Sequence, residues 1–487
     1  MFKQLSPCPA FLPAFLLLAS VLPPCHAEGP YQATGFKVGE VTSTTAIIWT
    51  RLSLRPERNG LDLPMVEIRY ATNSQERRKR AVEEIIYPND VTVSDIRDAV
   101  PGTAGQVRVL FRPRGVEKWQ QTSWEAVDPG EDFTQQFQLR KLTPGTTYDV
   151  RIDTQSSPNR ETGQSLEGSF QTAPPAKTPA RVVFTVSTGQ AYNDRDDEQG
   201  YDIYPTMLKL KPNFFVHTGD IIYYDRLAKT EALAHYHWQR TYSLPTNVLF
   251  HRNVSSYFIK DDHDSWVNDC WPTMKTKYMH EFTFVRGLEI FRHQVPMGRS
   301  TYRTRRWGQD LQIWMVEGRD FRSANTDPDG PAKTIWGEKQ KEWFKRTVRQ
   351  SDATFKVLVS PTPLVGPDRD NKKDNHANKG FTVEGNELRE FIASQQNMVV
   401  VCGDRHWQYM SVDPRTGTRE YSCGPASDKH AGGWQQDDYR KEYHRYLNVT
   451  GGFLSATVER SEGTPSLTFR YHDSDGTVNF TDILSPR

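Results

Sequence analysis

Cysteine is scarce in this sequence. Only five of its 487 residues are cysteines, and two of these, Cys8 and Cys25, lie in the N-terminal segment. The remaining three, Cys270, Cys402 and Cys423, are an odd number and have no Cys-x-x-Cys spacing. A disulfide framework and a thiolate zinc site are therefore excluded. A single disulfide between two of these three cysteines remains possible, and the sequence does not indicate which two would pair.

A hydrophobic run of membrane-spanning length is also missing. The apolar run at residues 11–19 is shorter than the roughly 20 residues that a span needs, and prolines interrupt the segment. A lysine precedes the run, and Cys25-His26-Ala27 follows it with small residues in the positions of a cleavage site. Residues 1–27 therefore predict a cleaved signal peptide and an exported protein, periplasmic or secreted. A membrane anchor and a lipid on Cys25 are the weaker alternatives.

An excess of charge of either sign is absent as well. Lys and Arg number 61 against 60 Asp and Glu, which leaves a formal charge of +1. This balance does not suggest a polyanion binder or an acidic tail, so no specific nucleic-acid recognition is inferred. The composition, 36% hydrophobic and 25% charged, is that of an ordinary globular chain long enough for two domains. The oligomeric state stays open.

Short β-rich runs dominate the first third of the chain. Residues 36–50 contain two of them, separated by a Thr-Ser-Thr turn. Tyr148 follows a Pro-Gly turn at the start of an alternating strand, which predicts a tyrosine corner whose phenol bonds to backbone upstream. Residues 168–179 supply a last strand and a proline-rich linker, and the charged region within 76–132 is interpreted as a solvated insertion. We therefore predict a small fibronectin/immunoglobulin-like β-sandwich over residues 30–175.

After residue 179 the pattern changes to apolar strands alternating with amphipathic helices, which is typical of an α/β domain. We place this domain at residues 180–487. The tail returns to alternating β-type sequence and is expected to complete a second sheet. Helices are predicted at residues 204–210, 338–350 and 384–394. Strands are predicted at residues 181–187, 214–217, 257–259, 311–316, 355–359 and 398–402.

Polar clusters follow five of these strands directly where each strand ends. In open α/β sheets, ligands bind beyond the carboxyl ends of the strands. One such ending alone is usually a turn or a solvated side chain, but five at one edge indicate a functional site. The clusters are Gly219-Asp220, Asp261-Asp262-His263-Asp264, Arg319-Asp320-Phe321-Arg322, Ser360-Pro361-Thr362-Pro363 and Gly403-Asp404-Arg405-His406.

The carboxylates and imidazoles of these clusters suit hard or borderline divalent and trivalent cations. Two ions held about 4 Å apart can hold a hydroxide between them and clamp both the attacking and the leaving oxygen of a displacement at phosphorus. We therefore expect two or more metal ions and a metal-bound hydroxide that attacks the phosphorus of a phosphate ester. The identity of the metals stays open among Ca²⁺, Mn²⁺, Zn²⁺ and Fe³⁺.

Three of the clusters resemble the signature blocks of a known family. Residues 219–223 read Gly-Asp-Ile-Ile-Tyr, residues 261–264 Asp-Asp-His-Asp, and residues 403–407 Gly-Asp-Arg-His-Trp. From about residue 35 to the end, their order and spacing are similar to the alkaline phosphatase D (PhoD-like) branch of the calcineurin-like metallophosphoesterases. The resemblance implies a four-layer α/β/β/α metallophosphatase domain behind the N-terminal sandwich. It also implies a hydrolase of small-molecule or polymeric phosphate esters, either a monoesterase or a phosphodiesterase.

The resemblance further implies a role for individual residues. Asp220 would bridge two metals and Tyr223 would bind as a phenolate, whereas Asp262 stands where the wider superfamily has an Asn ligand. His263 would be the catalytic imidazole that stabilises the phosphoryl transition state or assists the leaving group. The implied metal ligands are Asp220, Tyr223, Asp262, Asp404 and His406.

One position departs from the family pattern. In the family the first strand ends in a Ser-Cys-Gln-like triplet whose Cys can ligate ferric iron, whereas here residues 187–190 read Ser-Thr-Gly-Gln, with Gly189 in place of the thiolate. The iron-plus-calcium set of the family therefore stays open, and oxygen-rich ligands favour Ca²⁺, Mn²⁺ or Zn²⁺. Cys402 is expected to be a core residue. Asp194, Asp196 and Asp197 either supply an oxygen ligand or form an acidic surface loop.

Two further features are candidates for substrate contact. Arg319 directly follows a strand, where its guanidinium could bind phosphate oxygens or pair with Asp320. The polar loop 368–379 could be a lid that carries His376 into the site, or a mobile surface loop. A non-catalytic secreted binding protein on a retired scaffold and a sulfate-ester hydrolase with the same site remain alternative functions.

Overall fold

The computed structural model describes residues 29–72, 82–158 and 162–486. The predicted signal peptide at 1–27 and the charged residues 76–80 lie outside these ranges. Among the helices in the described part of the chain, none combines the length and the apolar character that crossing a membrane requires.

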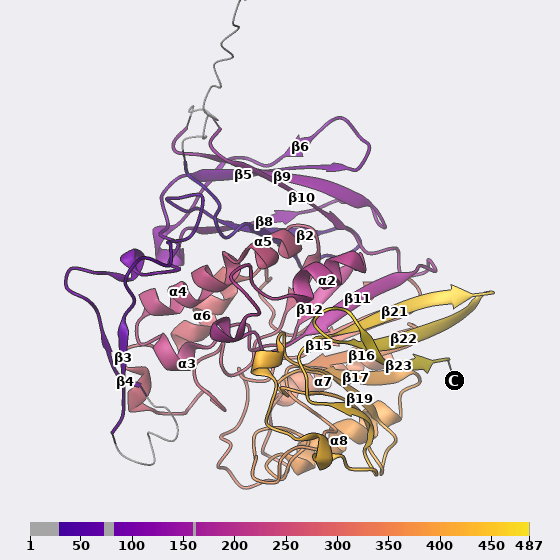
Figure 1. Cartoon of the computed structure of the whole chain (residues 1–487). Helices are drawn as coiled ribbons and strands as arrows, with labels where there is room; N and C mark the ends of the chain where they lie inside the picture. Colours follow the sequence, from indigo (N-terminus) through magenta and orange to yellow (C-terminus); the bar gives the residue numbers. More distant parts are fainter. Residues whose placement is uncertain (1–28, 73–81, 159–161, 487) are drawn as a thin grey trace, which may run out of the picture.

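A nine-stranded sheet runs through most of the molecule (Figure 1). Its centre is parallel and consists of β11 (Val182–Ser187), β12 (Phe214–His217) and β13 (Ser255–Phe258). Next to β11 lie the antiparallel strands β21 (Phe453–Ser461), β22 (Thr464–His472) and β23 (Val478–Leu484). Next to β13 lie β1 (Phe36–Gly39), β2 (Ala46–Arg51) and β8 (Thr134–Leu139). The C-terminal tail therefore extends the first sheet, and the expectation that it completes a second one is wrong.

A seven-stranded sheet packs against the first. In spatial order its strands are β14 (Arg303–Trp307), β15 (Leu311–Met315), β16 (Phe355–Ser360), β17 (Met398–Cys402), β19 (Arg419–Cys423), β18 (Gln408–Val412) and β20 (His444–Asn448). Trp307 of this sheet lies 4.8 Å from Phe214 of the first, measured between ring centroids. The core between the sheets is continuous because every residue of β12, β16 and β17 is buried.

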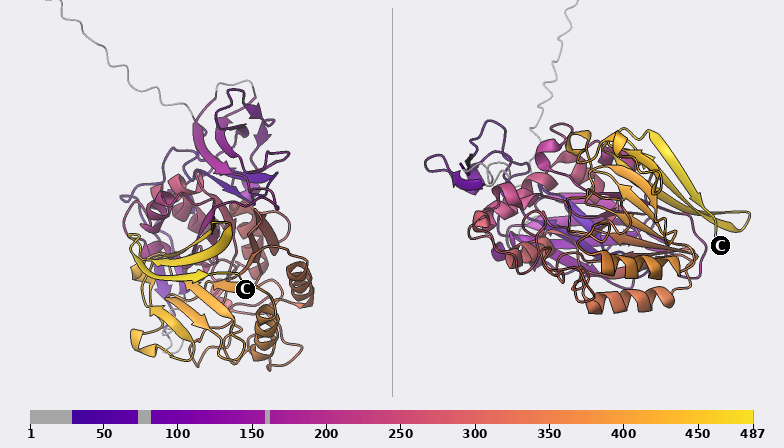
Figure 2. Two further views of the ribbon diagram at one scale, coloured as in Figure 1. Left: turned by 90° about the vertical axis from the view of Figure 1, so that its right-hand side faces the viewer. Right: turned by 90° about the horizontal axis from the view of Figure 1, so that it is seen from below.

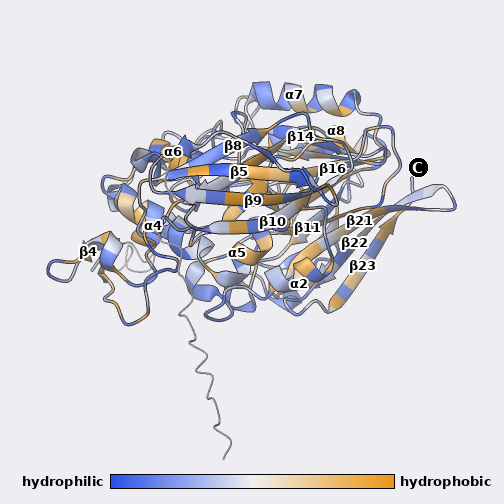
Figure 3. Ribbon diagram, turned by 90° about the horizontal axis from the view of Figure 1, so that it is seen from above, coloured by the Kyte–Doolittle hydropathy of each residue, from blue (hydrophilic) through white to orange (hydrophobic). Residues whose placement is uncertain are grey.

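Helices cover the outer face of each sheet, which confirms the four-layer α/β/β/α arrangement. The first sheet carries α2 (Ile203–Lys209), α4 (Glu231–Tyr242), α5 (Pro245–His251) and α6 (Phe284–Gln294). The second carries α7 (Glu338–Arg349) and α8 (Thr382–Ala393), which Figure 2 shows in orange. In α7 the buried residues Gln340, Phe344 and Val348 recur every four positions, and the outer face is hydrophilic (Figure 3).

The N-terminal strands form a sandwich that shares a sheet with the α/β region. A third sheet, built from β5 (Gln106–Pro113), β9 (Thr147–Gln155) and β10 (Ser165–Gln171) with the short strands β6 (Gln120–Gln121) and β7 (Glu125–Ala126), faces β1, β2 and β8. The tyrosine corner is confirmed, because the Tyr148 hydroxyl accepts a hydrogen bond from the backbone N–H of Thr143 at 2.9 Å. A separate hairpin, β3 (Glu67–Tyr70) and β4 (Val82–Ile86), projects beside α3 (Tyr224–Leu227) (Figure 1).

Candidate metal centre

The loops after β12 and β13 are held together at the edge of the first sheet. The carboxylate of Asp264 accepts backbone N–H bonds from Asp220 at 3.3 Å, Ile221 at 3.3 Å and Asp261 at 2.7 Å. A Cβ on Gly219 would lie 2.6 Å from the Asp261 Cβ, so only glycine allows this approach. Asp220 follows with a φ of 57°, a left-handed conformation that is uncommon outside glycine and often occurs at functional sites.

One group of candidate ligands lies at this junction, and we name it the Asp262 cluster. It consists of Asp220, Asp262 and His263, whose ligand atoms lie within 4.8 Å of one another. The Asp262 carboxylate also accepts the backbone N–H of His263 at 3.1 Å and that of Asp269 at 2.5 Å. These bonds fix the carboxylate before any ligand arrives.

A second group, the Tyr223 cluster, consists of Asp220, Tyr223, His406 and His430. The Tyr223 hydroxyl lies 3.3 Å from Asp220 Oδ2, 3.5 Å from His406 Nε2 and 2.6 Å from His430 Nε2. His406 Nε2 is 3.7 Å from Asp220 Oδ2. Asp220 therefore belongs to both clusters, where it could bridge two metal ions as predicted.

The residues present fit metal ions. Asp220 is 1% exposed, and its Oδ1 has no hydrogen-bond partner in the described part of the chain. Burial raises the pKa of Asp220 well above its usual value, with the carboxylates of Asp262 and Asp261 adding to the rise and His263 opposing it. A cation would offset both the unpaired oxygen and the crowded negative charge. Carboxylate, phenol and imidazole donors suit hard or borderline cations.

His263 differs from the other members of the Asp262 cluster because a carboxylate already holds its ring. Its Nδ1 lies 3.1 Å from Asp225 Oδ1. Burial lowers the pKa of His263, but Asp225, Asp262 and Asp220 outweigh burial and raise it well above its usual value. Asp225 therefore holds the ring at Nδ1 and favours its protonated form, which suits the predicted catalytic role better than that of a ligand.

Asp404 stands at the end of β17, where the second sheet meets the first. A Cβ on Gly403 would lie 2.4 Å from Thr218 Oγ1 and 2.8 Å from Thr188 Oγ1, so glycine is needed for this close approach. Asp404 has a φ of 64°, donates its backbone N–H to Thr188 at 3.3 Å and pairs its carboxylate with Arg405. Asp220 and Asp404, both in left-handed conformations, thus lie in the loops that follow β12 and β17.

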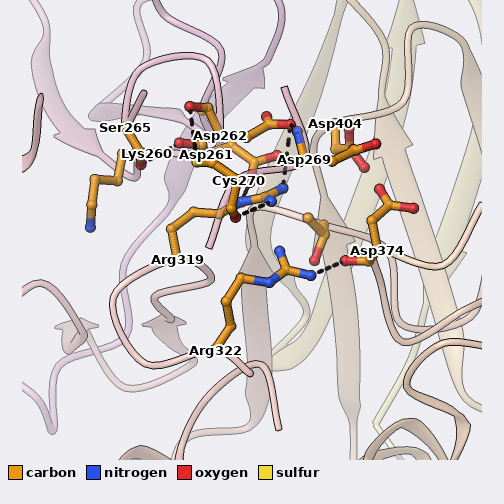
Figure 4. Close-up of polar contacts among 12 residues, drawn as sticks. Lys260, Asp261, Asp262, Ser265, Asp269, Cys270, Arg319, Arg322, Asp374 and Asp404 are labelled. Carbon is orange, nitrogen blue, oxygen red and sulfur yellow. Dashed lines mark hydrogen bonds and ion pairs between the residues drawn. The ribbon is translucent and has the colours of Figure 1, made fainter. Parts of the chain in front are cut away.

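The side chain of Arg319 is buried and bonded to neighbouring loops. It is fully buried, and its Nε donates to Asp261 Oδ1 at 2.6 Å while another guanidinium nitrogen donates to the Cys270 carbonyl (Figure 4). Asp320 pairs with Lys260 at 2.8 Å instead. Arg319 therefore stabilises the loop that carries Asp261 and Asp262. Its guanidinium is enclosed in the protein, so this geometry does not support the predicted contact with substrate.

His376 is likewise not brought into the site. It is 1% exposed, and its Nε2 lies 2.9 Å from Glu384 Oε2 on α8. The loop around it is held in place at two points. Arg405 donates to Asp368 at 2.8 Å. Arg322 donates to the Asp374 carbonyl (Figure 4). The structure thus gives His376 a position in the packing against α8 and does not support a lid that carries it to substrate.

Like Asp225 beside His263, His430 is a site residue that the sequence analysis missed. It ends the 3-10 turn Asp428–His430, after β19, and its Nδ1 lies 2.7 Å from Asp194 Oδ2. Asp194 therefore reaches the site through an imidazole and not as a direct oxygen ligand. Asp196 accepts hydrogen bonds from Ser427 Oγ at 2.9 Å and from the Asp202 backbone, and so holds the same turn in place. Without an adjacent motif, His430 had no sequence signal beyond being a histidine in a polar loop.

The three cysteines among the described residues belong to neither cluster. Cys270, Cys402 and Cys423 are buried and free. Cys402 lies within β17, as expected of a core residue, and burial raises its thiol pKa well above the usual value. The disulfide that the sequence left open is not formed among the described residues.

Two cavities open onto the Tyr223 cluster. One has a volume of about 400 Å³ and reaches Leu61 and Met65 of the N-terminal region. The other has a volume of about 820 Å³ and reaches Trp271 and Lys275. Their linings have three residues in common, namely Tyr223, Arg226 and His430. Two cavities thus adjoin the candidate metal centre.

Two stacked sheets with carboxylate and imidazole clusters at their strand ends define the class of metallophosphatases. The family model of the PhoD-like phosphatases matches residues 184–450, which is more than half of the chain. The chain therefore belongs to the PhoD-like phosphatase family, and family and fold together make it a metal-dependent phosphoric-ester hydrolase.

Solved structures agree at the level of the fold. The structure of PhoD has a TM-score of 0.69 at 16% identity, over 95% of this chain and 90% of that one. The purple acid phosphatase PPD1 from seeds of yellow lupin (Lupinus luteus) has a TM-score of 0.61 at 11% identity, over 92% of this chain and 74% of that one. No curated protein sequence matches the chain.

Proposed function

We propose that this chain is an exported phosphodiesterase, which hydrolyses phosphate diesters at the junction of the Asp262 and Tyr223 clusters. The observation that supports a diester is the pair of cavities, about 400 and 820 Å³, that meet at Tyr223, Arg226 and His430. A phosphorus atom at that junction can extend one ester group into each hollow, whereas a monoester needs only one. Mixed apolar and polar walls suit organic substituents on both sides.

The residues that would hold two metals are Asp220 in both clusters, Asp262 in one, and Tyr223 and His406 in the other. When bound, such ions supply Lewis-acid charge to phosphoryl oxygens and lower the pKa of water toward neutrality. His263, whose protonated form Asp225 favours, would donate its remaining N–H proton to the leaving alkoxide oxygen, which departs as the alcohol while the imidazole becomes neutral. Arg226 lines both cavities, where its guanidinium can bind a non-bridging oxygen.

Hydrolysis of a bis-aryl phosphate, an aryl phosphate and an aryl sulfate by the purified protein, with and without chelator, tests this proposal. We expect the highest kcat/KM for the diester, loss of activity in chelator and recovery with added metal. Asp220→Ala should be inactive under all conditions, and Asp475→Asn, a change in an exposed turn, should be fully active. A higher kcat/KM for the monoester would contradict the diester assignment, and full activity in chelator or in Asp220→Ala would contradict a metal-dependent hydrolase.

Export is proposed on the pattern of residues 1–27 alone. In a bacterial host the full chain should appear outside the cytoplasm with Glu28 as its first residue, as N-terminal sequencing can check. A chain that begins at Glu28 should stay in the cytoplasm. Retention of the full chain with an intact N-terminus would overturn export and leave the assignment of the reaction untouched.

A further inference from the structure

His430 has the surroundings of a metal ligand. Its Nε2 lies 2.6 Å from the Tyr223 hydroxyl, and the same hydroxyl is within 3.5 Å of one oxygen of Asp220 and Nε2 of His406. The rings of His406 and His430 lie side by side, 4.1 Å between centroids. Two imidazoles, a phenol and a carboxylate thus converge on one small volume, which is a donor set that holds borderline cations.

The second nitrogen of His430 is bonded in the way that metal-binding histidines require. Its Nδ1 lies 2.7 Å from Asp194 Oδ2, and a carboxylate at this place fixes the tautomer that leaves Nε2 free to coordinate. Asp194 in turn is fixed in the 3-10 turn Tyr192–Asp194. The turn that carries His430 is anchored separately, because Asp428 accepts from Thr450 Oγ1 at 2.6 Å and from the Gly451 N–H at 2.8 Å.

Gly189 leaves room for this imidazole. A Cβ built on Gly189 would lie 3.1 Å from Cδ2 of His430 and 3.5 Å from Cδ2 of His406. A side chain at position 189 would therefore contact both imidazoles of the Tyr223 cluster. Gly189 has a φ of 50°, a backbone conformation in which a residue with a side chain is strained. The backbone therefore favours glycine at position 189.

We propose that His430, oriented by Asp194, is a metal ligand of the Tyr223 cluster. The inference rests on the proposed metal-dependent function. With His430 as a ligand, the Tyr223 cluster offers only oxygen and nitrogen donors and no thiolate. Such a donor set suits Zn²⁺ or Mn²⁺.

Zinc titration of the chelator-stripped, signal-free protein by calorimetry provides the test, because it measures binding and not turnover. Wild-type protein should bind two Zn²⁺ per chain. Asp194→Asn should weaken one of the two sites by about 10- to 100-fold, since it removes only the group that orients the ligand. His430→Ala should weaken the same site further, and Asp262→Ala should weaken the other one.

Added imidazole distinguishes a ligand from a residue that merely packs against Tyr223. His430 lines both cavities, so free imidazole can enter the space that His430→Ala leaves and should restore zinc affinity in that variant. His293→Ala, at a half-exposed histidine of α6, is the matched control and should bind zinc as wild type does.

The outcomes separate the two proposals. Two unchanged zinc sites in His430→Ala, or a loss of affinity that imidazole does not repair, would overturn the role of His430 and leave the metal-dependent hydrolase standing. Wild-type protein that binds no zinc, manganese, calcium or iron would overturn both.

Discussion

At the scale of single residues, Asp220 joins the two halves of the site. Its carboxylate contacts Tyr223 and His406 on one side and belongs to the Asp262 cluster on the other. Its left-handed backbone and the glycine before it follow from the close approach of the Asp261 loop. The Gly-Asp pair was recognisable in the sequence because this backbone requirement and the ligand chemistry fall on adjacent residues. His430 was not, because it lies far along the chain and its partner Asp194 reads as part of an acidic loop.

The pair of His263 and Asp225 predicts a pH dependence. Because Asp225 contributes to raising the pKa of His263 well above its usual value, the protonated form is present below that pKa and is lost as pH rises through it. Asp225→Asn removes this charge, so the alkaline limb of the kcat/KM profile should move to lower pH by about one unit or more. Profiles of the two proteins with a bis-aryl phosphate check this, and coincident alkaline limbs would contradict it.

At the scale of elements, the central strands and three helices were predictable because apolar runs of the right length mark buried strands, and an amphipathic pattern with Phe344 and Val348 four positions apart marks α7. The short helices α3 and α5 were missed, and so were the longer helices α4 and α6. Helix α4 buries polar and charged side chains such as Gln239 and Arg240 beside its apolar ones, which obscures its pattern. The pairing of β21 with β11, and hence the position of the tail, depends on contacts between segments about 270 residues apart, which no local pattern encodes.

Glu384 of α8 and His376 of the preceding loop form a second pH-sensitive pair. Burial raises the pKa of Glu384, but His376 and the Ile335 N–H outweigh it and lower the pKa from the usual 4.5 to about 2. This ionised carboxylate therefore stabilises the fold above pH 4.5 by about 3 kcal/mol, and the contribution is lost as pH falls from 4.5 toward 2.

Glu384→Gln should accordingly lower the free energy of unfolding at neutral pH, and the difference from wild type should shrink on acidification. Urea unfolding at pH 7 and at the lowest pH where both proteins fold measures this. The kcat/KM of the variant should stay near that of wild type, because His376 and Glu384 lie outside the site. A variant as stable as wild type at pH 7, or one that folds normally but has lost activity, would contradict the assignment.

At the scale of the whole molecule, the N-terminal strands are part of the catalytic framework. Strand β1 continues the sheet of β13, with Gly39 opposite Ser256. Buried contacts cross the same border, since Glu40 pairs with Arg303 at 2.6 Å and the Tyr257 hydroxyl donates to the Val41 carbonyl at 2.6 Å. The predicted boundary near residue 175 separates two regions of sequence, but a shared sheet joins them.

Glu40→Ala should therefore destabilise the entire chain. It leaves the buried Arg303 without its carboxylate, and loss of one partner of a buried pair costs about 3–5 kcal/mol. Calorimetry should show a single transition that moves to lower temperature, because the two regions unfold together. Two separate transitions, with the one of the α/β region unchanged, would show that the regions are independent.

The buried, unpaired cysteines have a consequence for how this protein matures. Because Cys270, Cys402 and Cys423 are free and enclosed in the core, no covalent cross-link has to form for the described fold to close. We therefore expect the described fold to form in reducing and oxidising surroundings alike, without a thiol oxidase or a disulfide isomerase. On the proposed metal-dependent function, metal supply would then matter more for activity than the redox state of the surroundings.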